Sequence, residues 1–94
     1  MFTVDKKTRY IKSDEGFDVL LGFKSIIYRD NRMEVNIYSE ELLDPYVIEI
    51  YANTMEITKN YISDLEMNSK EINLIIDRLS KVLDFAGLEY KVTY

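Results

Sequence analysis

The sequence contains no cysteine and no histidine, and these two absences remove much of the common chemistry of protein sites. Without cysteine the chain can form neither disulfides nor thiolate metal sites, which fits a reducing compartment. Without histidine it lacks the commonest general base and a principal ligand of zinc. We therefore expect a cytoplasmic protein that is not an enzyme and has no metal and no cofactor.

Glycine and proline are also scarce, with three glycines and one proline in 94 residues. Gly16, Gly22 and Gly87 are too far apart to form a phosphate-binding loop, and no serine lies in a nucleophile elbow. No apolar run is long enough for a signal-peptide core or a membrane span, so we expect no export and no membrane partner. The length and the globular composition predict a single domain over residues 1–94.

Three short stretches that contain acidic residues invite a metal interpretation, and we assign a metal site to none of them. Asp14-Glu15-Gly16 and the pair Asp64/Glu66 do not repeat the ligand spacing of a calcium loop. Glu89-Tyr90-Lys91 has the acid-x-lysine spacing that some magnesium-dependent nucleases use on a strand. Such nucleases need another acid on a neighbouring strand, and an acidic chain repels phosphate, so we interpret this spacing as a coincidence.

The net charge of −5 is unevenly distributed along the chain. The segment from residue 34 to residue 66 contains one basic residue, Lys59. Its acidic residues are Glu34, Glu40, Glu41, Asp44, Glu49, Glu56, Asp64 and Glu66. Such a segment repels nucleic acid and attracts basic partners. The alternative is a solvated surface whose acidity only maintains solubility.

The basic residues concentrate near the start of the chain, where Lys6, Lys7, Arg9 and Lys12 surround Tyr10. Four charges are a weak footprint for nucleic-acid binding, and Asp5, Asp14 and Glu15 flank them. A solvated edge strand protected by lysine explains the pattern better. We expect no nucleic-acid partner.

The clearest secondary-structure signal predicts a helix from about residue 69 to residue 86. Asn68 and Glu71 have the spacing of an N-cap and its N3 partner, and Gly87 stands where a left-handed residue ends a helix. Apolar residues recur between these signals at spacings of three and four, which forms one apolar stripe. They are Ile72, Ile75, Ile76, Leu79, Val82, Leu83 and Ala86.

The remaining signals predict strands. Alternating or β-branched runs occur at residues 8–12, 17–21, 25–29, 33–39, 46–51 and 90–94. Asp14-Glu15-Gly16 and Asp30-Asn31-Arg32 suit hairpin turns, Gly22 suggests a bulge or bend, and residues 39–45 suggest a loop. Asn53-Thr54 either bends the strand that begins at Tyr46 or splits it in two. The predicted class is α+β, with a mostly antiparallel sheet of about five or six strands, one C-terminal amphipathic helix and a final strand.

Strand alternation predicts which face of the sheet is buried. Val35, Ile37, Ile48 and Ile50 should face the helix, with Ile72, Ile75, Ile76, Leu79 and Leu83 packed against them. The opposite face should carry Glu34, Tyr38, Glu49 and Tyr51, with Glu40, Glu41 and Asp44 at its rim. Tyrosine is enriched at interfaces, so we predict that this face binds a partner. Alternatively, these tyrosines serve only cross-strand packing.

The run Tyr46-Val47-Ile48-Glu49-Ile50-Tyr51-Ala52-Asn53, followed by an isoleucine-rich helix and a last strand, resembles short α+β immunity proteins of bacterial polymorphic toxin systems. These include the contact-dependent growth inhibition type. The resemblance covers the order of elements over residues 25–94, but Met55 to Thr58 stand where that group has a tryptophan. It implies a cytoplasmic protein that binds a cognate toxin domain, often a basic nuclease, and blocks its active site or substrate groove.

A second interpretation is a self-associating structural or regulatory domain. Antiparallel sheets with open edges pair readily into two-fold dimers, so a homodimer is compatible with the predicted elements. The sequence does not decide between these two functions.

Overall fold

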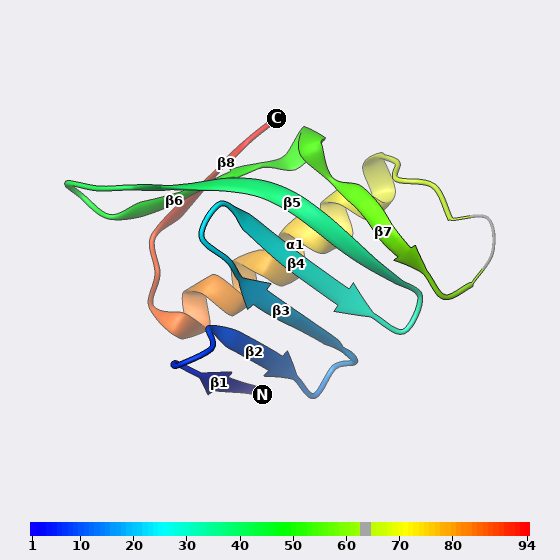
Figure 1. The fold of residues 1–94 in the computed structure, drawn as a ribbon, viewed down its shortest axis with the longest axis horizontal. Coiled ribbons are helices and arrows are strands. Elements are labelled where there is room, and N and C mark those ends of the chain that lie inside the picture. Colours follow the sequence, from blue (N-terminus) through cyan, green and yellow to red (C-terminus); the bar gives the residue numbers. More distant parts are fainter. Residues whose placement is uncertain (63–64) are drawn as a thin grey trace.

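The computed structural model describes residues 1–62 and 65–94. Its order of elements is strands, then one helix, then a last strand (Figure 1). The elements are β1 (Phe2–Asp5), β2 (Tyr10–Ser13), β3 (Phe17–Leu21), β4 (Ser25–Asp30), β5 (Met33–Leu42), β6 (Val47–Tyr51), the 3₁₀ helix η1 (Ala52–Thr54), β7 (Glu56–Asn60), α1 (Ser69–Ala86) and β8 (Tyr90–Thr93).

The strands form one mixed sheet of eight strands, in the order β1-β2-β3-β4-β5-β6-β8, with β7 paired to β5 beside β6. The pair β6/β8 is parallel, and the other pairs in the described ranges are antiparallel. Figure 1 shows α1 lying diagonally across one face of this twisted sheet. The predicted α+β class is confirmed, although the sheet has more strands than the five or six expected.

Strand β5 is longer than predicted, and the expected loop at residues 39–45 is wrong for its first half. The strand continues to Leu42 because its polar end pairs with β6, where Ser39 opposes Ile50 and Glu40 opposes Glu49. Ser39 is only 2% exposed, so its neighbours in the fold override its weak strand preference.

The run after Tyr46 is split in two, which settles the choice that the sequence left open. β6 pairs with the C-terminal half of β5 and β7 with its N-terminal half, while η1 occupies the gap between them. The Thr54 hydroxyl accepts a hydrogen bond from the Tyr38 N–H at 2.9 Å and donates one to the Tyr51 carbonyl at 2.6 Å. One side chain therefore satisfies backbone groups where the ladder of β5 changes partner.

Helix α1 has the predicted bounds because both end signals act locally. Asn68 Oδ1 accepts the Glu71 N–H at 3.0 Å, and Gly87 adopts a left-handed conformation with φ 72°. The N–H groups of Gly87 and Leu88 then bond to the carbonyls of Asp84 and Leu83, a Schellman-type ending.

The core lies between α1 and the sheet, as the apolar patterns predicted. Val35, Ile37, Ile48 and Ile50 are at most 2% exposed and belong to one hydrophobic cluster with the helix. From the helix, Ile75, Leu79 and Leu83 are fully buried, but Ile72 and Ile76 are only partly buried at the margin of the stripe. The prediction that all five helix residues would be buried is thus wrong for these two.

A network of charged and polar groups joins the helix to the sheet at the β4/β5 turn. Asp30, whose side chain is 2% exposed, accepts hydrogen bonds from Tyr28 Oη at 2.7 Å and from Arg32 Nη2 at 3.1 Å. Arg32 also forms a two-pronged contact with Glu71, with both distances 2.9 Å. Arg78 donates to the Tyr28 hydroxyl and lies 3.5 Å from Asp30.

Two features near the start of the chain were missed or only partly predicted. β1 is a short strand that no pattern indicated, and it is held by distant contacts of Phe2 with Phe17 and Phe85, at ring-centroid distances of 6.1 and 5.3 Å. Gly22 does mark a bend, because it stands in the turn between β3 and β4. A Cβ atom there would lie 2.8 Å from the Ser25 carbonyl oxygen, so only glycine fits.

Candidate functional site

The outward face of the sheet carries a compact group of side chains where β5 and β6 pair. We call Tyr38, Glu40, Glu49 and Tyr51 the Tyr-Glu cluster. Alternation places these side chains on the face away from α1, because Ile37, Ser39, Ile48 and Ile50 point the other way and are buried. Glu40 and Glu49 are direct cross-strand partners, and the rings of Tyr38 and Tyr51 lie 5.2 Å apart.

Hydrogen bonds connect the members of the Tyr-Glu cluster. The Tyr38 hydroxyl donates to Glu40 Oε1 at 2.7 Å. The Tyr51 hydroxyl donates to Glu49 Oε1 at 2.9 Å and lies 3.4 Å from Glu40 Oε2, between the two carboxylates. The aromatic rings and carboxylates therefore form one ordered surface instead of independent side chains.

Side chains of strand β8 contact the Tyr-Glu cluster from one side. Thr93 Oγ1 donates to Glu49 Oε2 at 2.8 Å, and Lys91 Nζ lies 3.8 Å from the same oxygen. The alternation of residues 89–94 places Thr93 and Lys91 on one side of that strand, but the sequence gives no sign that β8 runs parallel to β6. Their part in the site was therefore missed.

The charges of the cluster follow from these contacts. Hydrogen bonds from Thr93 and then Tyr51 hold the pKa of Glu49 below its ordinary value, so Glu49 is ionised near neutral pH. The hydrogen bond to Glu49, aided by desolvation, raises the pKa of Tyr51 to about 12. A hydrogen bond to Glu40 likewise raises the pKa of Tyr38. Both tyrosines consequently stay protonated and remain hydrogen-bond donors.

Two acidic side chains directly opposite each other across strands repel and reduce stability. Glu40 and Glu49 stand in this arrangement, and Lys91 is 3.8 Å away on one side only. A cation brought by a partner would relieve the repulsion and could also lie against the ring of Tyr38, which is 39% exposed. The arrangement is therefore suited to receiving a lysine or arginine side chain.

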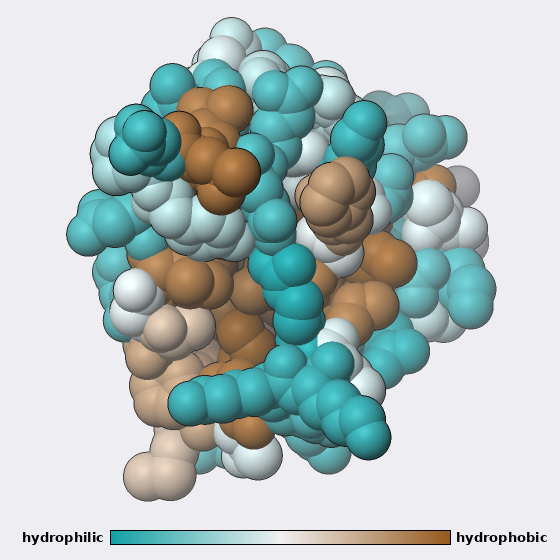
Figure 2. Space-filling model, turned by 60° about the vertical axis from the view of Figure 1, so that its left-hand side comes forward, coloured by the Kyte–Doolittle hydropathy of each residue, from teal (hydrophilic) through white to brown (hydrophobic). Residues whose placement is uncertain are grey.

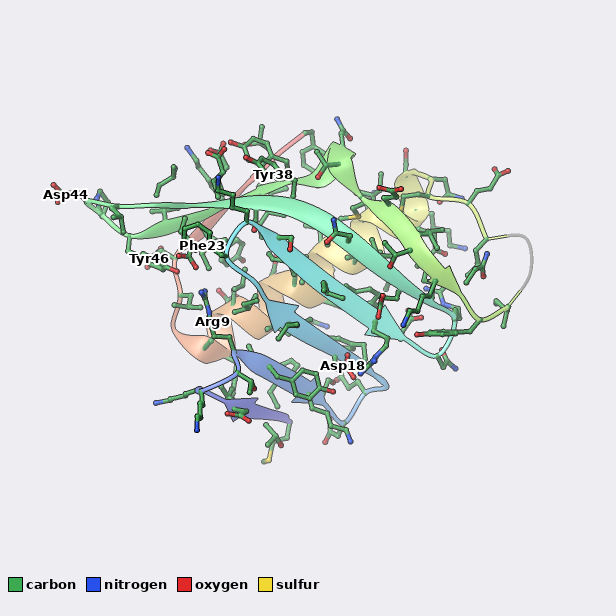
Figure 3. All side chains as sticks on the ribbon, viewed as in Figure 1. Arg9, Asp18, Phe23, Tyr38, Asp44 and Tyr46 are labelled. Carbon is green, nitrogen blue, oxygen red and sulfur yellow. The ribbon has the colours of Figure 1, made fainter. Side chains whose placement is uncertain are left out.

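The structure brings together four of the seven residues that the sequence assigned to the partner-binding face. Glu34 shares the outward face but lies at the other end of β5, where its carboxylate accepts a hydrogen bond from Thr58 at 3.0 Å. The prediction that Glu34 lies beside Tyr38 at the centre of the face is wrong, because three residues of an extended strand separate the two positions. Asp44 lies at the far tip of the β5/β6 hairpin (Figure 3).

Glu41 does not belong to the rim of this face. Its neighbour Glu40 points outward, so Glu41 points to the helix side, where Arg9 Nη2 lies 2.6 Å from its carboxylate. Asp64, another acid of the predicted segment and half of the Asp64/Glu66 pair, lies outside the described residues.

The described residues hold no group of three or more acidic side chains that could bind a metal ion. Within the same ranges, α1 is not long and apolar enough to cross a membrane. Comparison with known proteins gives no match, whether with family models, with curated proteins or with solved structures.

Proposed function

We propose that the protein is a cytoplasmic immunity protein that binds and neutralises a cognate toxin domain rich in basic residues. The observation that carries this proposal is the Tyr-Glu cluster, in which two opposed carboxylates and two aromatic rings form an ordered outward surface. The net charge of −5 and the resemblance of residues 46–53 to short immunity proteins support the same function.

The proposed mechanism is occlusion. A lysine or arginine that the toxin uses to hold its substrate would lie over Tyr38 and beside the carboxylates of Glu40 and Glu49. This contact would neutralise the two carboxylates and add aromatic contact area, which is how interface hot spots are commonly built. Blocking the toxin in this way requires no reaction and no cofactor, and nucleic acid would be excluded by charge.

The test is binding to the product of the neighbouring gene, measured as association and dissociation rates. Tyr51→Ala should dissociate about thirtyfold faster than the unchanged protein, the loss typical of a hot-spot side chain. Tyr61→Ala is the matched control, because Tyr61 is 49% exposed and lies beyond β7, away from the cluster. Melting curves of both variants establish that each remains folded.

Either of two results would contradict the proposal. One is a neighbouring gene product that shows no binding and no toxicity when it is produced alone in cells. The other is equal dissociation rates for Tyr51→Ala and Tyr61→Ala, which would mean that the partner binds another surface.

Self-association is the second candidate function, and the edge position of β8 favours it. β8 ends the strand order, so its outer side has no strand partner in the described part of the chain. Open edges of this kind pair with another copy. A mass in sedimentation equilibrium that rises from monomer to dimer with concentration would support this function, and a monomer at all concentrations would exclude it.

A further inference from the structure

An apolar groove opens at the end of the molecule where α1 finishes. It lies between the last residues of α1 and strands β1 to β3, and its volume is about 480 Å³. Figure 2 shows hydrophobic residues gathered in a hollow at this end, with hydrophilic residues across and below it. The apolar wall consists of Val4, Ile11, Leu21, Phe85, Ala86 and Leu88.

Two basic side chains, Lys6 and Arg9, complete the lining of the groove. Arg9 is already neutralised, because its guanidinium lies 2.6 Å from the carboxylate of Glu41. Lys6 is exposed and forms no salt bridge among the described residues, so it supplies the net positive charge of the groove.

The size of the groove favours a small molecule over a protein. Ligand sites are typically about 300 to 1,000 Å³, with apolar walls and a few polar groups that fix orientation. A stable protein interface instead covers about 800 Å² on each partner, far more than one such groove offers.

We propose that this groove binds a single straight alkyl chain that ends in an anionic group, with the chain against the apolar wall and the head beside Lys6. The site is on the helix side of the sheet, whereas the Tyr-Glu cluster is on the opposite face. It is therefore separate from the proposed toxin-binding surface and would be a second ligand site of the molecule.

The first experiment is calorimetric titration with hexanoate, octanoate and decanoate. Each methylene that enters the groove should tighten binding about fourfold, because burying one CH₂ contributes roughly 0.8 kcal/mol. The increase should stop when the groove is full. Affinity that does not change with chain length, or no binding by any of the three, would overturn the proposal.

The second experiment tests the anionic head. Decanoate should bind more tightly than decanol or decyltrimethylammonium, and Lys6→Gln should weaken decanoate about threefold while leaving decanol unchanged. Lys70→Gln is the matched control, because Lys70 is exposed at the opposite end of α1. Equal affinity for the anionic and the cationic amphiphile would contradict the assignment of Lys6.

A third variant tests the location without removing any core contact. Ala86 lines the groove and is only partly buried, so Ala86→Leu should occupy the space in which the chain lies. We expect decanoate binding to fall at least tenfold while the melting temperature is retained. Unchanged binding in a folded Ala86→Leu protein would show that the amphiphile lies elsewhere.

Discussion

Both carboxylate oxygens of the buried Asp30 accept hydrogen bonds. One oxygen of its carboxylate accepts the N–H groups of Arg32 and Met33 at 2.8 and 3.1 Å, and the other accepts the Tyr28 hydroxyl and an Arg32 guanidinium N–H. Its side chain is 2% exposed, so water cannot replace a lost partner. A buried carboxylate with this many donors stabilises the fold only while it is ionised.

Asp30→Asn should lower the free energy of unfolding by about 3 kcal/mol at neutral pH, because the Tyr28 hydroxyl and two arginines lose their anionic partner. Asp77→Asn is the control, since Asp77 has a 66% exposed side chain and forms a surface pair with Lys81. The expected loss for that control is under about 0.5 kcal/mol. Urea unfolding of both variants measures the difference.

The same carboxylate predicts a dependence of stability on pH. Burial acts to raise the pKa of Asp30, but the hydrogen bonds from Tyr28, Arg32 and Met33 outweigh it and leave the pKa below the ordinary 3.8. The unfolded chain therefore takes up this proton first, so the stabilisation is complete above about pH 4 and is lost as the pH falls through the folded pKa. Urea midpoints between pH 7 and pH 2 should fall less steeply for Asp30→Asn, and parallel curves would contradict this.

At the residue scale, alternation from the sequence identified Tyr38, Glu49 and Tyr51 correctly as outward neighbours, because that information is local to each strand. It misassigned Glu41, since the run Glu40-Glu41 gives no sign that the strand continues through both residues. It also missed Arg9 as the partner of Glu41, because that contact joins positions 32 apart in the chain.

Among the elements, α1 was predictable to its ends and β5 was not. The cap at Asn68 and the left-handed Gly87 act within a few residues, so the helix ends can be predicted from the nearby sequence. The length of β5 depends on β6 and β7, which pair with its two halves. A local sequence pattern carries no information about which strand pairs with the segment in the folded protein.

Alanine substitutions in adjacent turns of α1 should differ in how much they lower the free energy of unfolding. Leu79 is fully buried, so Leu79→Ala should lower the free energy of unfolding by about 3 kcal/mol through lost burial and a cavity. Ile76 is only partly buried at the margin of the core, so Ile76→Ala should cost about half as much. Urea unfolding compares the two, and a larger loss for Ile76 than for Leu79 would contradict the packing.

At the scale of the whole molecule, the acidic groups should act at two ranges on a basic partner. In the proposed complex the Tyr-Glu cluster would make the contact, whereas Asp44, at the tip of the long hairpin (Figure 3), would act only through its electric field. Charges at a rim change association rates and the response to salt more than they change dissociation. Replacing Asp44 by asparagine removes the charge without straining the backbone, because asparagine also tolerates the φ of 64° at this position.

Asp44→Asn should therefore slow association with the basic partner about twofold at low salt and leave dissociation unchanged. The difference should vanish near 1 M salt, where the screening length is about 3 Å. Glu15→Gln is the control of equal charge, because Glu15 lies in the β2/β3 turn, away from the β5/β6 hairpin (Figure 1). Equal slowing by both variants would mean that net charge alone, and not the hairpin, guides the encounter.

The place of β8 in the sheet also leads to an expectation about the order in which the molecule assembles. In the ranges that the structure describes, β8 joins the sheet only through β6, and the contact of Thr93 with Glu49 spans 44 positions of the chain. A parallel pair needs a crossover connection, and here that connection includes β7 and α1, so β8 should dock only after a long loop has closed at an entropic cost. As an edge strand β8 should open more readily than the central strands, and each opening would release Thr93 and Lys91 from Glu49. We therefore expect the Tyr-Glu cluster to lose its contacts with β8 from time to time while the central strands stay paired, which hydrogen exchange of the β8 amides would measure.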